Sequence, residues 1–289
     1  MEDKNECPKI KLYNGNEIPQ LGFGVYQIKG DELTEKCVLE ALKVGYRHID
    51  TAHFYENERG VGSAIKKSGI PRDQIWVTSK IWVTEYGSGK TTQAINNMLK
   101  RLDLEYIDLV LLHYPLNDYL GAYKELEAEY EKGRIKNIGI SNFEDNKFEE
   151  IYNAAKIKPV LNQIELHPFY QQKNIRERMN NVNVKTEGWA PLAETKNNLF
   201  NEEVIQKAAT KYKKSPAQII LRWHIQSGFI TIPKSVKPER IKENFEIFDF
   251  ELTEEEMNGI NKLDGKKGRI QYNSLILKVG LWLMPKPKD

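Results

Sequence analysis

Residues 45–58 read GYRHIDTAHFYENE, and later parts of the chain repeat the pattern that they set. The run from His48 to Asp50 is short and partly apolar, with helix-like sequence on both sides, which predicts a buried parallel strand that ends on Asp50. Tyr55 follows five residues later, just before a helical run at 59–67. A carboxylate at the end of a strand and a phenol in the next loop can meet in one cleft. Taken alone, the stretch is explained about as well by a capping Asp and a half-buried Tyr.

Six further β-prone runs end on polar, titratable or aromatic residues and lead into sequence with helical periodicity. The runs are 74–79, 106–112, 135–140, 159–162, 184–188 and 228–233, and the residues that follow them are Lys80, His113, Ser141 with Asn142, Gln163, Trp189, and Lys234 with Ser235. Alternating buried strands and helices predict either a doubly wound sheet or a (β/α)8 TIM barrel. In a barrel the carboxyl ends of all strands open onto one face, where active sites lie. One shared pocket explains the residues at the strand ends best, so the sequence favours the barrel.

Length and composition fit one α/β domain. We expect a single domain over 1–289, with the barrel at 9–265 and a C-terminal tail at 266–289, since a barrel of about 250 residues is typical. The net charge of +2, with no basic run among aromatic residues, argues against a nucleic-acid partner. Two cysteines, Cys7 and Cys37, indicate a reducing compartment. The charged first residues are unlike a signal peptide and no apolar run could span a bilayer, so we expect a cytoplasmic protein without a membrane partner. We also expect a monomer.

The segments around the first strand have structural roles. Residues 9–20 alternate apolar and polar side chains around Asn14-Gly15, which predicts a β-hairpin that plugs the bottom of the barrel. Residues 22–25 form the predicted first strand, and apolar spacing predicts the first helix at 31–44. Apolar periodicity predicts further helices at 91–102, 118–132 and 145–155. Pro216 and Pro238 at first-turn positions predict helices through 226 and over 239–248, and Thr253 with Glu256 forms a capping box for one more helix after them.

Two glycine-rich segments resemble nucleotide-binding motifs only in part. After GFGV at 22–25, Gln27 stands where the third glycine of a dinucleotide-binding fingerprint would be. Before GSGKT at 87–91, Thr84 takes the place of the first glycine of a phosphate loop, and the next strand ends in His113 rather than in an acid that could hold magnesium. We therefore expect no Rossmann fold, no NTPase site and no metal site.

Five segments, in order along the chain, resemble the signatures of one enzyme family. The Asp-Thr-Ala-x-x-Tyr core at 50–55 resembles the first signature of the aldo-keto reductase family, and LVLLHYP at 109–115 is similar to its histidine segment. GISNF at 139–143, NQIE at 162–165 and IPKS at 232–235 are similar to its cofactor-binding segments. The resemblance covers about residues 9–265, as in small single-domain members of the family. It implies a (β/α)8 barrel that binds NADP(H) without a Rossmann fold and reduces an aldehyde or a ketone.

The resemblance implies four catalytic residues: Asp50, Tyr55, Lys80 and His113. Hydride addition leaves negative charge on the carbonyl oxygen, so a positioned acid must supply a proton, and Tyr55 is the candidate. An unperturbed phenol titrates near ~10, and we expect the ammonium group of Lys80 to favour the phenolate and so ease release of the proton. Asp50 would hold Lys80 charged and in place, and His113 would orient the substrate oxygen. Taken singly, Lys80 could be a surface lysine and His113 a buried structural histidine.

The same resemblance assigns residues to the nicotinamide end of the cofactor. Ser141, Asn142 and Gln163 would bind the carboxamide. Trp189 would stack on the nicotinamide, a position where many relatives have tyrosine. The remaining predicted cofactor contacts are Gly24, Thr51, Pro191, Leu192, Ile232, Val236, Glu243 and Asn244.

We expect the cofactor to be NADPH because cationic side chains follow the last strand. Lys234, Ser235 and Arg240 stand where the family binds the adenosine 2′-phosphate. The planar fork of Arg suits a phosphate. Arg240 could also be a solvated charge on a helix.

The walls of the substrate pocket are predicted by family position. Tyr26, His53, Trp82 and Tyr114 would line it, and Tyr114 stands where many relatives have tryptophan. The loop after His113 is short, and so is the stretch at 191–201, which suggests an open site for small or extended carbonyl compounds rather than for steroids. His113 also argues against the family branch that reduces steroid double bonds, which has glutamate there. The apolar residues at 275–284 could form a lid over the barrel mouth, or pack on an outer helix or a second subunit.

Two other classes of function remain open from sequence. A nonenzymatic relative, like the barrel subunits attached to potassium channels, could bind NADP(H) as a sensor with little turnover, although the lack of an extension before the barrel argues against it. Alternatively, Lys80 could form a Schiff base in an aldolase-type lyase, although the expected pairing with Asp50 opposes this.

Overall fold

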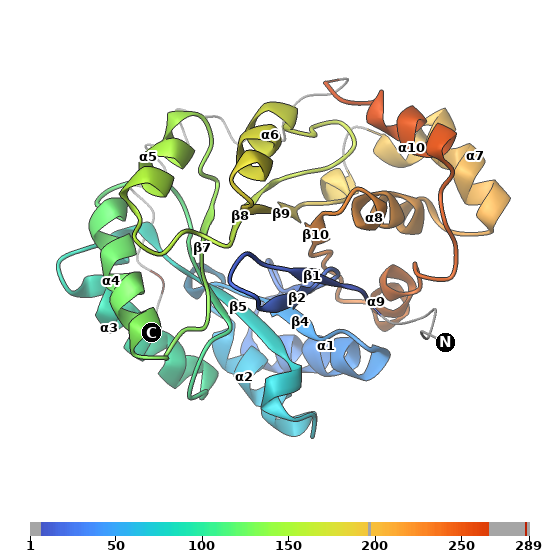
Figure 1. Ribbon diagram of the computed structural model, residues 1–289. Coiled ribbons are helices and arrows are strands. Elements are labelled where there is room, and N and C mark those ends of the chain that lie inside the picture. The colour runs from blue at the N-terminus through green and yellow to red at the C-terminus, as the bar shows by residue number, and fades with distance from the viewer. Residues whose placement is uncertain (1–6, 196–197, 266–286, 288–289) are drawn as a thin grey trace.

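The computed structural model describes residues 7–195, 198–265 and 287, and a parallel eight-stranded sheet lies at its centre (Figure 1). The strands are, in their order in the sheet, β3 (Phe23–Gly24), β4 (His48–Asp50), β5 (Trp76–Ile81), β6 (Leu109–Leu112), β7 (Ile138–Ser141), β8 (Leu161–Glu165), β9 (Lys185–Trp189) and β10 (Ile230–Thr231). The sheet closes on itself, because Leu21 pairs in parallel with Thr231 and the Gly22 N–H donates to the Thr231 carbonyl at 2.8 Å. The predicted (β/α)8 barrel is confirmed, and the doubly wound sheet is excluded.

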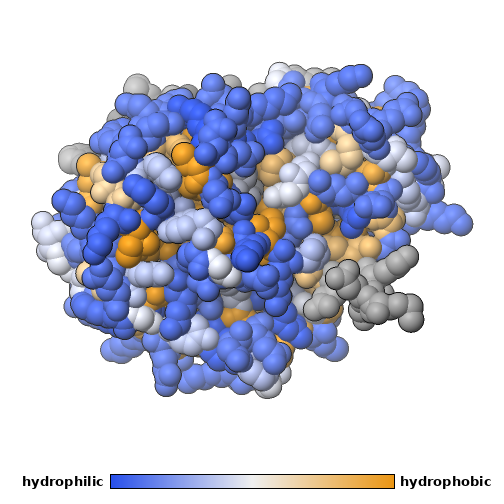
Figure 2. Space-filling view, in the orientation of Figure 1, coloured by the Kyte–Doolittle hydropathy of each residue, from blue (hydrophilic) through white to orange (hydrophobic). Residues whose placement is uncertain are grey.

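Helices and short 3-10 turns connect the strands and cover the outside of the barrel (Figure 1). The helices are α1 (Asp31–Val44), α2 (Glu58–Lys67), α3 (Lys90–Leu102), α4 (Tyr119–Glu131), α5 (Asn146–Ala154), α6 (Lys173–Asn181), α7 (Glu203–Tyr212), α8 (Pro216–Gln226), α9 (Pro238–Phe245) and α10 (Glu254–Asn261). The 3-10 turns are η1 (His53–Tyr55), η2 (Arg72–Gln74), η3 (Val83–Glu85), η4 (Ala193–Thr195) and η5 (Leu199–Asn201). The face shown in Figure 2 is mainly hydrophilic, with apolar side chains in small separate groups.

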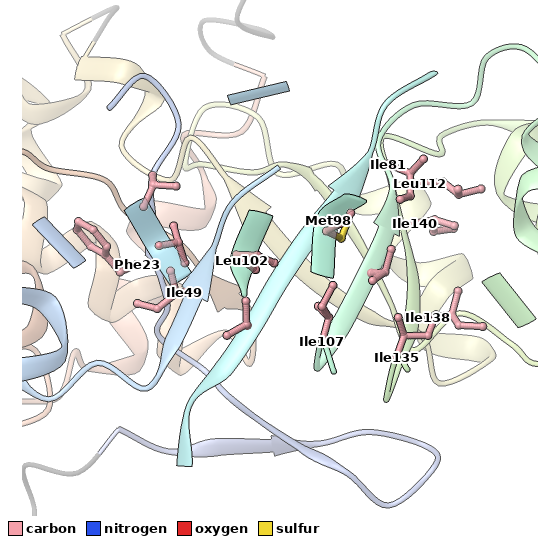
Figure 3. Close-up of a cluster of buried hydrophobic side chains, with 14 of the residues drawn as sticks. Phe23, Ile49, Ile81, Met98, Leu102, Ile107, Leu112, Ile135, Ile138 and Ile140 are labelled. Atoms are coloured by element: carbon pink, nitrogen blue, oxygen red, sulfur yellow. The ribbon is translucent and has the colours of Figure 1, made fainter. Parts of the chain in front are cut away.

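Alternate residues of each strand face different cores, since successive side chains of a strand point to opposite sides. In β6, Leu112 belongs to the cluster of buried apolar side chains that also includes Met98 and Leu102 of α3, in the layer between strands and helices (Figure 3). Leu109 and Leu111 belong instead to a cluster inside the barrel. The same alternation sends the even-numbered residues of β4 and β5 and the odd-numbered residues of β8 and β9 into the barrel. These inward positions include titratable residues, which must be paired or neutral there.

An antiparallel hairpin of β1 (Lys9–Lys11) and β2 (Glu17–Pro19) closes the amino end of the barrel. Figure 3 shows it running beneath the amino ends of the strands. Ile18 packs with Trp76 in the inner cluster. The amides of Asn14 and Asn16 donate to the Asn137 side chain at 2.8 and 3.0 Å. The predicted plug is therefore present.

The structure departs from the predicted elements in a few places. Lys80, Ser141, Gln163 and Trp189 were expected after their strands but lie inside β5, β7, β8 and β9. Helix α6 was not predicted, and it buries only Ile175 and Met179, too few apolar residues to give a periodic signal. Helix α7 was also not predicted, and the predicted helix at 239–248 ends at residue 245.

Two expectations concern the membrane and the tail. None of the described helices is long and apolar enough to cross a bilayer. The predicted tail at 266–289, with its alternative roles as lid or packing segment, lies outside the described residues apart from residue 287.

Candidate active site

Asp50 and Lys80 form a buried ion pair at the carboxyl ends of β4 and β5. The Lys80 Nζ donates to Asp50 Oδ1 and Oδ2 at 2.7 and 2.8 Å. It also donates to the Thr51 carbonyl at 2.9 Å. Asp50 is 2% exposed and Lys80 is fully buried. A surface lysine is therefore excluded, and the ammonium group persists inside the protein because its charge is paired and its protons are hydrogen-bonded.

Tyr55 lies beside this ion pair, at the end of η1. Its hydroxyl oxygen is 3.3 Å from Lys80 Nζ, and the ammonium group lies 4.9 Å from the centre of the phenol ring. Burial and then the Asp50 carboxylate raise the pKa of Tyr55 well above 10. We expected Lys80 to favour the phenolate, but in this structure burial and the Asp50 carboxylate outweigh its ammonium charge, so the pKa of Tyr55 is not lowered. Because Asp50 neutralises Lys80, burial dominates, and Tyr55 is a protonated phenol at neutral pH.

Buried hydrogen bonds fix the loop that carries Tyr55. The Thr51 hydroxyl donates to Asn57 Oδ1 at 2.8 Å. Asn57 Nδ2 donates to the carbonyls of Val25 and Ile28, each at 3.0 Å. Asn57 thus ties both ends of the loop to the segment after β3. This explains why the sequence between Thr51 and Asn57 adopts one conformation with the phenol facing Lys80.

An aromatic wall surrounds the phenol. The rings of Tyr26 and His113 lie 5.0 and 5.9 Å from that of Tyr55, centre to centre. His113 is in turn 5.1 Å from Trp82 and is stacked at 5.1 Å on Tyr114. Burial and the nearby Lys80 charge lower the pKa of His113 well below its usual value. His113 is therefore a neutral imidazole, which can donate one hydrogen bond without carrying charge.

His53 and Phe54 point to different places. His53 Nδ1 lies 2.9 Å from Glu85 Oε1, and His53 lines a cavity of about 180 Å³ together with Arg59 of α2. Phe54 stacks on Trp82 at 4.1 Å and meets His113 edge-on. The structure thus brings Phe54, rather than His53, to the aromatic wall. The only signal for Phe54 in the sequence was its place within the Asp-Thr-Ala-x-x-Tyr core.

Amide side chains connect the ion pair to Trp189. Gln163 Nε2 donates to Asp50 Oδ2 at 2.8 Å. Asn142 Nδ2 donates to the Ser141 hydroxyl at 3.0 Å, and the Trp189 indole donates to Asn142 Oδ1 at 2.9 Å. Trp189 is partly exposed. These residues form a polar strip beside an indole face at the open end of the barrel.

Several of the other predicted cofactor residues lie near the end of β10 and in α9. Gly24 packs closely on this segment, since a Cβ there would lie 2.9 Å from the Ile232 carbonyl oxygen. Lys234, Val236 and Arg240 are exposed, whereas Ser235 is buried and accepts from the Lys237 N–H at 3.1 Å. Of the rest, Thr51, Pro191 and Asn244 are buried, and Leu192 and Glu243 are partly buried.

Comparison with known proteins places this arrangement in a family. The model of the Aldo/keto reductase family matches residues 20–265. The chain belongs to this family. The reductase is 46% identical over 264 residues to a methylglyoxal reductase DkgA of Yersinia pestis, covering 90% of this chain and 94% of the relative. It is 45% identical over 257 residues to a glyoxal reductase of Bacillus subtilis, covering 88% and 92%.

A solved structure shows the same relationship. The aldo-keto reductase of Bombyx mori, in complex with NADP, matches this reductase with a TM-score of 0.88 and 30% sequence identity. The match covers 98% of this chain and 99% of the other. This aldo/keto reductase is therefore an oxidoreductase that acts on carbonyl groups with a cofactor of the NAD(P) type. In the described part of the chain, no three His, Cys, Asp or Glu side chains gather where they could hold a metal ion.

Sequence reasoning missed two buried residues beneath the ion pair. His48 of β4 and Glu187 of β9 are both fully buried, and His48 Nε2 lies 3.8 Å from Glu187 Oε1. The alternation of side chains along a strand could have identified them, because residues two positions apart point to the same side. His48 lies two residues before Asp50, and Glu187 lies two residues before Trp189.

Proposed function

We propose that this aldo/keto reductase uses NADPH to reduce small aldehydes and ketones, in particular 2-oxoaldehydes, with Tyr55 as the proton donor. The observation that carries the proposal is the buried contact between Lys80, Asp50 and Tyr55, enclosed by the aromatic wall. The relatives named as methylglyoxal and glyoxal reductases support the substrate class.

The residues at the barrel mouth fit a nicotinamide dinucleotide. A carboxamide offers two donor hydrogens and one acceptor, which match the hydroxyl of Ser141 and the amides of Asn142 and Gln163. The exposed cations Lys234 and Arg240, next to the amino end of α9, suit phosphate groups. The bound dinucleotide would supply the hydride.

The side chains around Tyr55 would handle the charge that develops on the substrate oxygen. A neutral His113 would donate a hydrogen bond to the carbonyl oxygen and orient it. Tyr55 would donate its proton to the same oxygen as it becomes an alkoxide. The raised pKa of Tyr55 keeps the proton in place until then, and an alkoxide is basic enough to take it. Lys80 would stabilise the phenolate that remains.

Substitution of Tyr55 tests this assignment. Tyr55→Phe keeps the ring and removes the donor, so kcat for methylglyoxal should fall by about 10² or more. Absorbance of the reduced nicotinamide follows turnover, and fluorescence titration with NADPH shows that the cofactor still binds. Tyr106→Phe is the matched control, because Tyr106 lies at the other end of the barrel, beside the hairpin residue Asn16 and Trp76. If Tyr55→Phe turns over at the rate of the parent enzyme, Tyr55 is not the donor.

The two alternatives make different predictions. A sensor subunit would bind NADPH tightly but turn over every carbonyl compound slowly. A Schiff-base lyase would need a neutral, accessible Lys80, whereas both oxygens of Asp50 bind its ammonium group in the buried site. Borohydride should therefore trap no carbonyl adduct on Lys80.

A further inference from the structure

Glu187 is a carboxyl group inside the barrel, one layer below the ion pair. On β9, Glu187 pairs in register with Gln163 of β8 and with Ile230 of β10. The side chain is fully buried. Gln163, the register partner of Glu187 on β8, donates to Asp50 Oδ2 at 2.8 Å, so Glu187 lies beside the residue whose amide binds the ion pair.

The groups that face Glu187 include no cation that is free to pair with a Glu187 carboxylate. From β4 come His48, with Nε2 at 3.8 Å, and Asp50. From β5 comes Lys80, and β10 contains no titratable residue. Burial lowers the pKa of His48 to about 3, so its contact with Glu187 is not an ion pair. The Thr78 hydroxyl lies 3.1 Å from the same ring nitrogen, Nε2.

This leaves one ammonium group for two carboxyl groups. Asp50 binds Lys80 with both oxygens, and that pair is already neutral. A charge on Glu187 would be a second, unbalanced negative charge in a dry interior. Burial, and then repulsion by Asp50, raise the pKa of Glu187 to about 8, although Lys80 and the Gln163 amide oppose the shift.

We infer that Glu187 is a positioning residue that stays a neutral acid while the enzyme works, and that loss of its proton to solvent in alkaline solution weakens Tyr55 as a proton donor. The inference rests on the proposed function, since it concerns the same proton transfer. Charge on Glu187 would act in two ways. It raises the pKa of Tyr55, and it would repel the negative charge that develops on the substrate oxygen beside that phenol.

The pH dependence of turnover tests the inference. We would measure kcat for methylglyoxal with saturating NADPH from pH 6 to 10 for the wild type, Glu187→Gln and Glu187→Asp. The wild type should lose at least about 10-fold in kcat through an apparent pKa near 8, with little change in the KM for NADPH. Glu187→Gln cannot ionise and should lose this inflection, whatever its rate at pH 7. Glu187→Asp keeps a titratable group and should retain one.

The matched control is Glu129→Gln, which removes a buried carboxyl group of α4 that pairs with Arg134 outside the barrel interior. It should keep the wild-type inflection. Deuterated NADPH reports whether hydride transfer limits the rate on both sides of the inflection. If Glu187→Gln shows the same inflection as the wild type, the inference is overturned.

Infrared spectra separate this inference from the proposed function, because they need no turnover. The carbonyl stretch of a protonated carboxylic acid should be present in the wild type at pH 7, should disappear on titration through about pH 8, and should shift in Glu187→Asp. If the band is absent at pH 7, Glu187 is ionised and the inference is wrong even if carbonyl compounds are reduced. If the band titrates as expected but no carbonyl compound is reduced, the proposed function fails and the inferred effect on Tyr55 falls with it. If Glu187→Gln does not fold, the wild-type and Glu187→Asp titrations decide.

Discussion

Lys80 shows how a single ammonium group sets the state of its neighbours. It is held by Asp50 and by the Thr51 carbonyl, and it reaches the phenol of Tyr55 at 3.3 Å. The sequence indicated the contact but not its outcome, because the pKa of Tyr55 depends on how far Asp50 cancels the charge of Lys80 and on burial. Neither quantity can be derived from residue types alone.

Removal of Lys80 separates stability from activity. Lys80→Met leaves the Asp50 carboxylate buried without its cation, which should cost about 3–5 kcal/mol of unfolding free energy. Adding Asp50→Asn removes that charge, so the double variant should recover much of the stability but none of the turnover. Urea unfolding and nicotinamide absorbance measure the two quantities. Equal stability of the single and double variants would contradict this account.

The expected preference for NADPH over NADH depends on one exposed side chain, that of Arg240. Arg240→Ala should raise the KM for NADPH about 10-fold or more and leave that for NADH nearly unchanged, since only NADPH has a 2′-phosphate. Lys242→Ala removes an exposed cation from the same helix, α9, and is the control. An unchanged preference in Arg240→Ala would refute the assignment.

At the scale of elements, the strand-to-helix connections position the chemistry. The apolar periodicity of the sequence predicted most strands and helices correctly, because buried parallel strands and amphipathic helices have distinct periods. It failed for α6, where Ile175 and Met179 alone face the core. It also assigned His53 to the pocket, whereas the short turn η1 directs Phe54 there and His53 toward Glu85. The orientation of such a turn depends on its tertiary hydrogen bonds.

Asn57 is the residue on which the orientation of that loop depends. Asn57→Ala removes hydrogen bonds to Thr51, Val25 and Ile28 and leaves buried polar groups unpaired, so we expect a loss of roughly 2–4 kcal/mol in stability. Because Tyr55 is then less well placed, kcat should fall about 10-fold or more at temperatures where the variant is still folded. Asn180→Ala, an exposed change on α6, should alter neither. A kcat equal to that of the wild type would show that the loop does not position Tyr55.

At the scale of the whole molecule, closing the sheet creates an interior that is apolar near the hairpin and ionisable near the mouth. Ile18 and Leu161 fill the end that the plug covers. His48 and Glu187 approach each other inside the barrel, and Asp50 and Lys80 form the ion pair at the carboxyl ends of β4 and β5. The fold therefore carries buried titratable groups whose protonation is linked to its stability.

The stability of the fold should depend on pH through Glu187. Its pKa is raised from 4.5 to about 8, so between these values the folded chain keeps a proton that the unfolded chain has lost. This contribution is present in full below about pH 4.5 and is lost as the pH rises to about 8, by roughly 1.4 kcal/mol per pH unit at most. Chemical unfolding at several pH values should show the wild type losing stability relative to Glu187→Gln between pH 5 and 8. A constant difference between the two over that range would contradict the raised pKa.

The sequence by itself determined the strand and helix order, the hairpin and the family segments, because these follow from local periodicity and from short motifs. It also indicated that Asp50, Lys80 and His113 at strand ends, and Tyr55 in the loop after Asp50, share one pocket. Only the tertiary structure decided that Phe54 rather than His53 reaches the aromatic wall, that Tyr55 keeps a raised pKa, and that Glu187 lies buried below the ion pair. The physical reason is that burial and the net charge around a group are sums over residues far apart in the chain, and only the closed barrel brings them together.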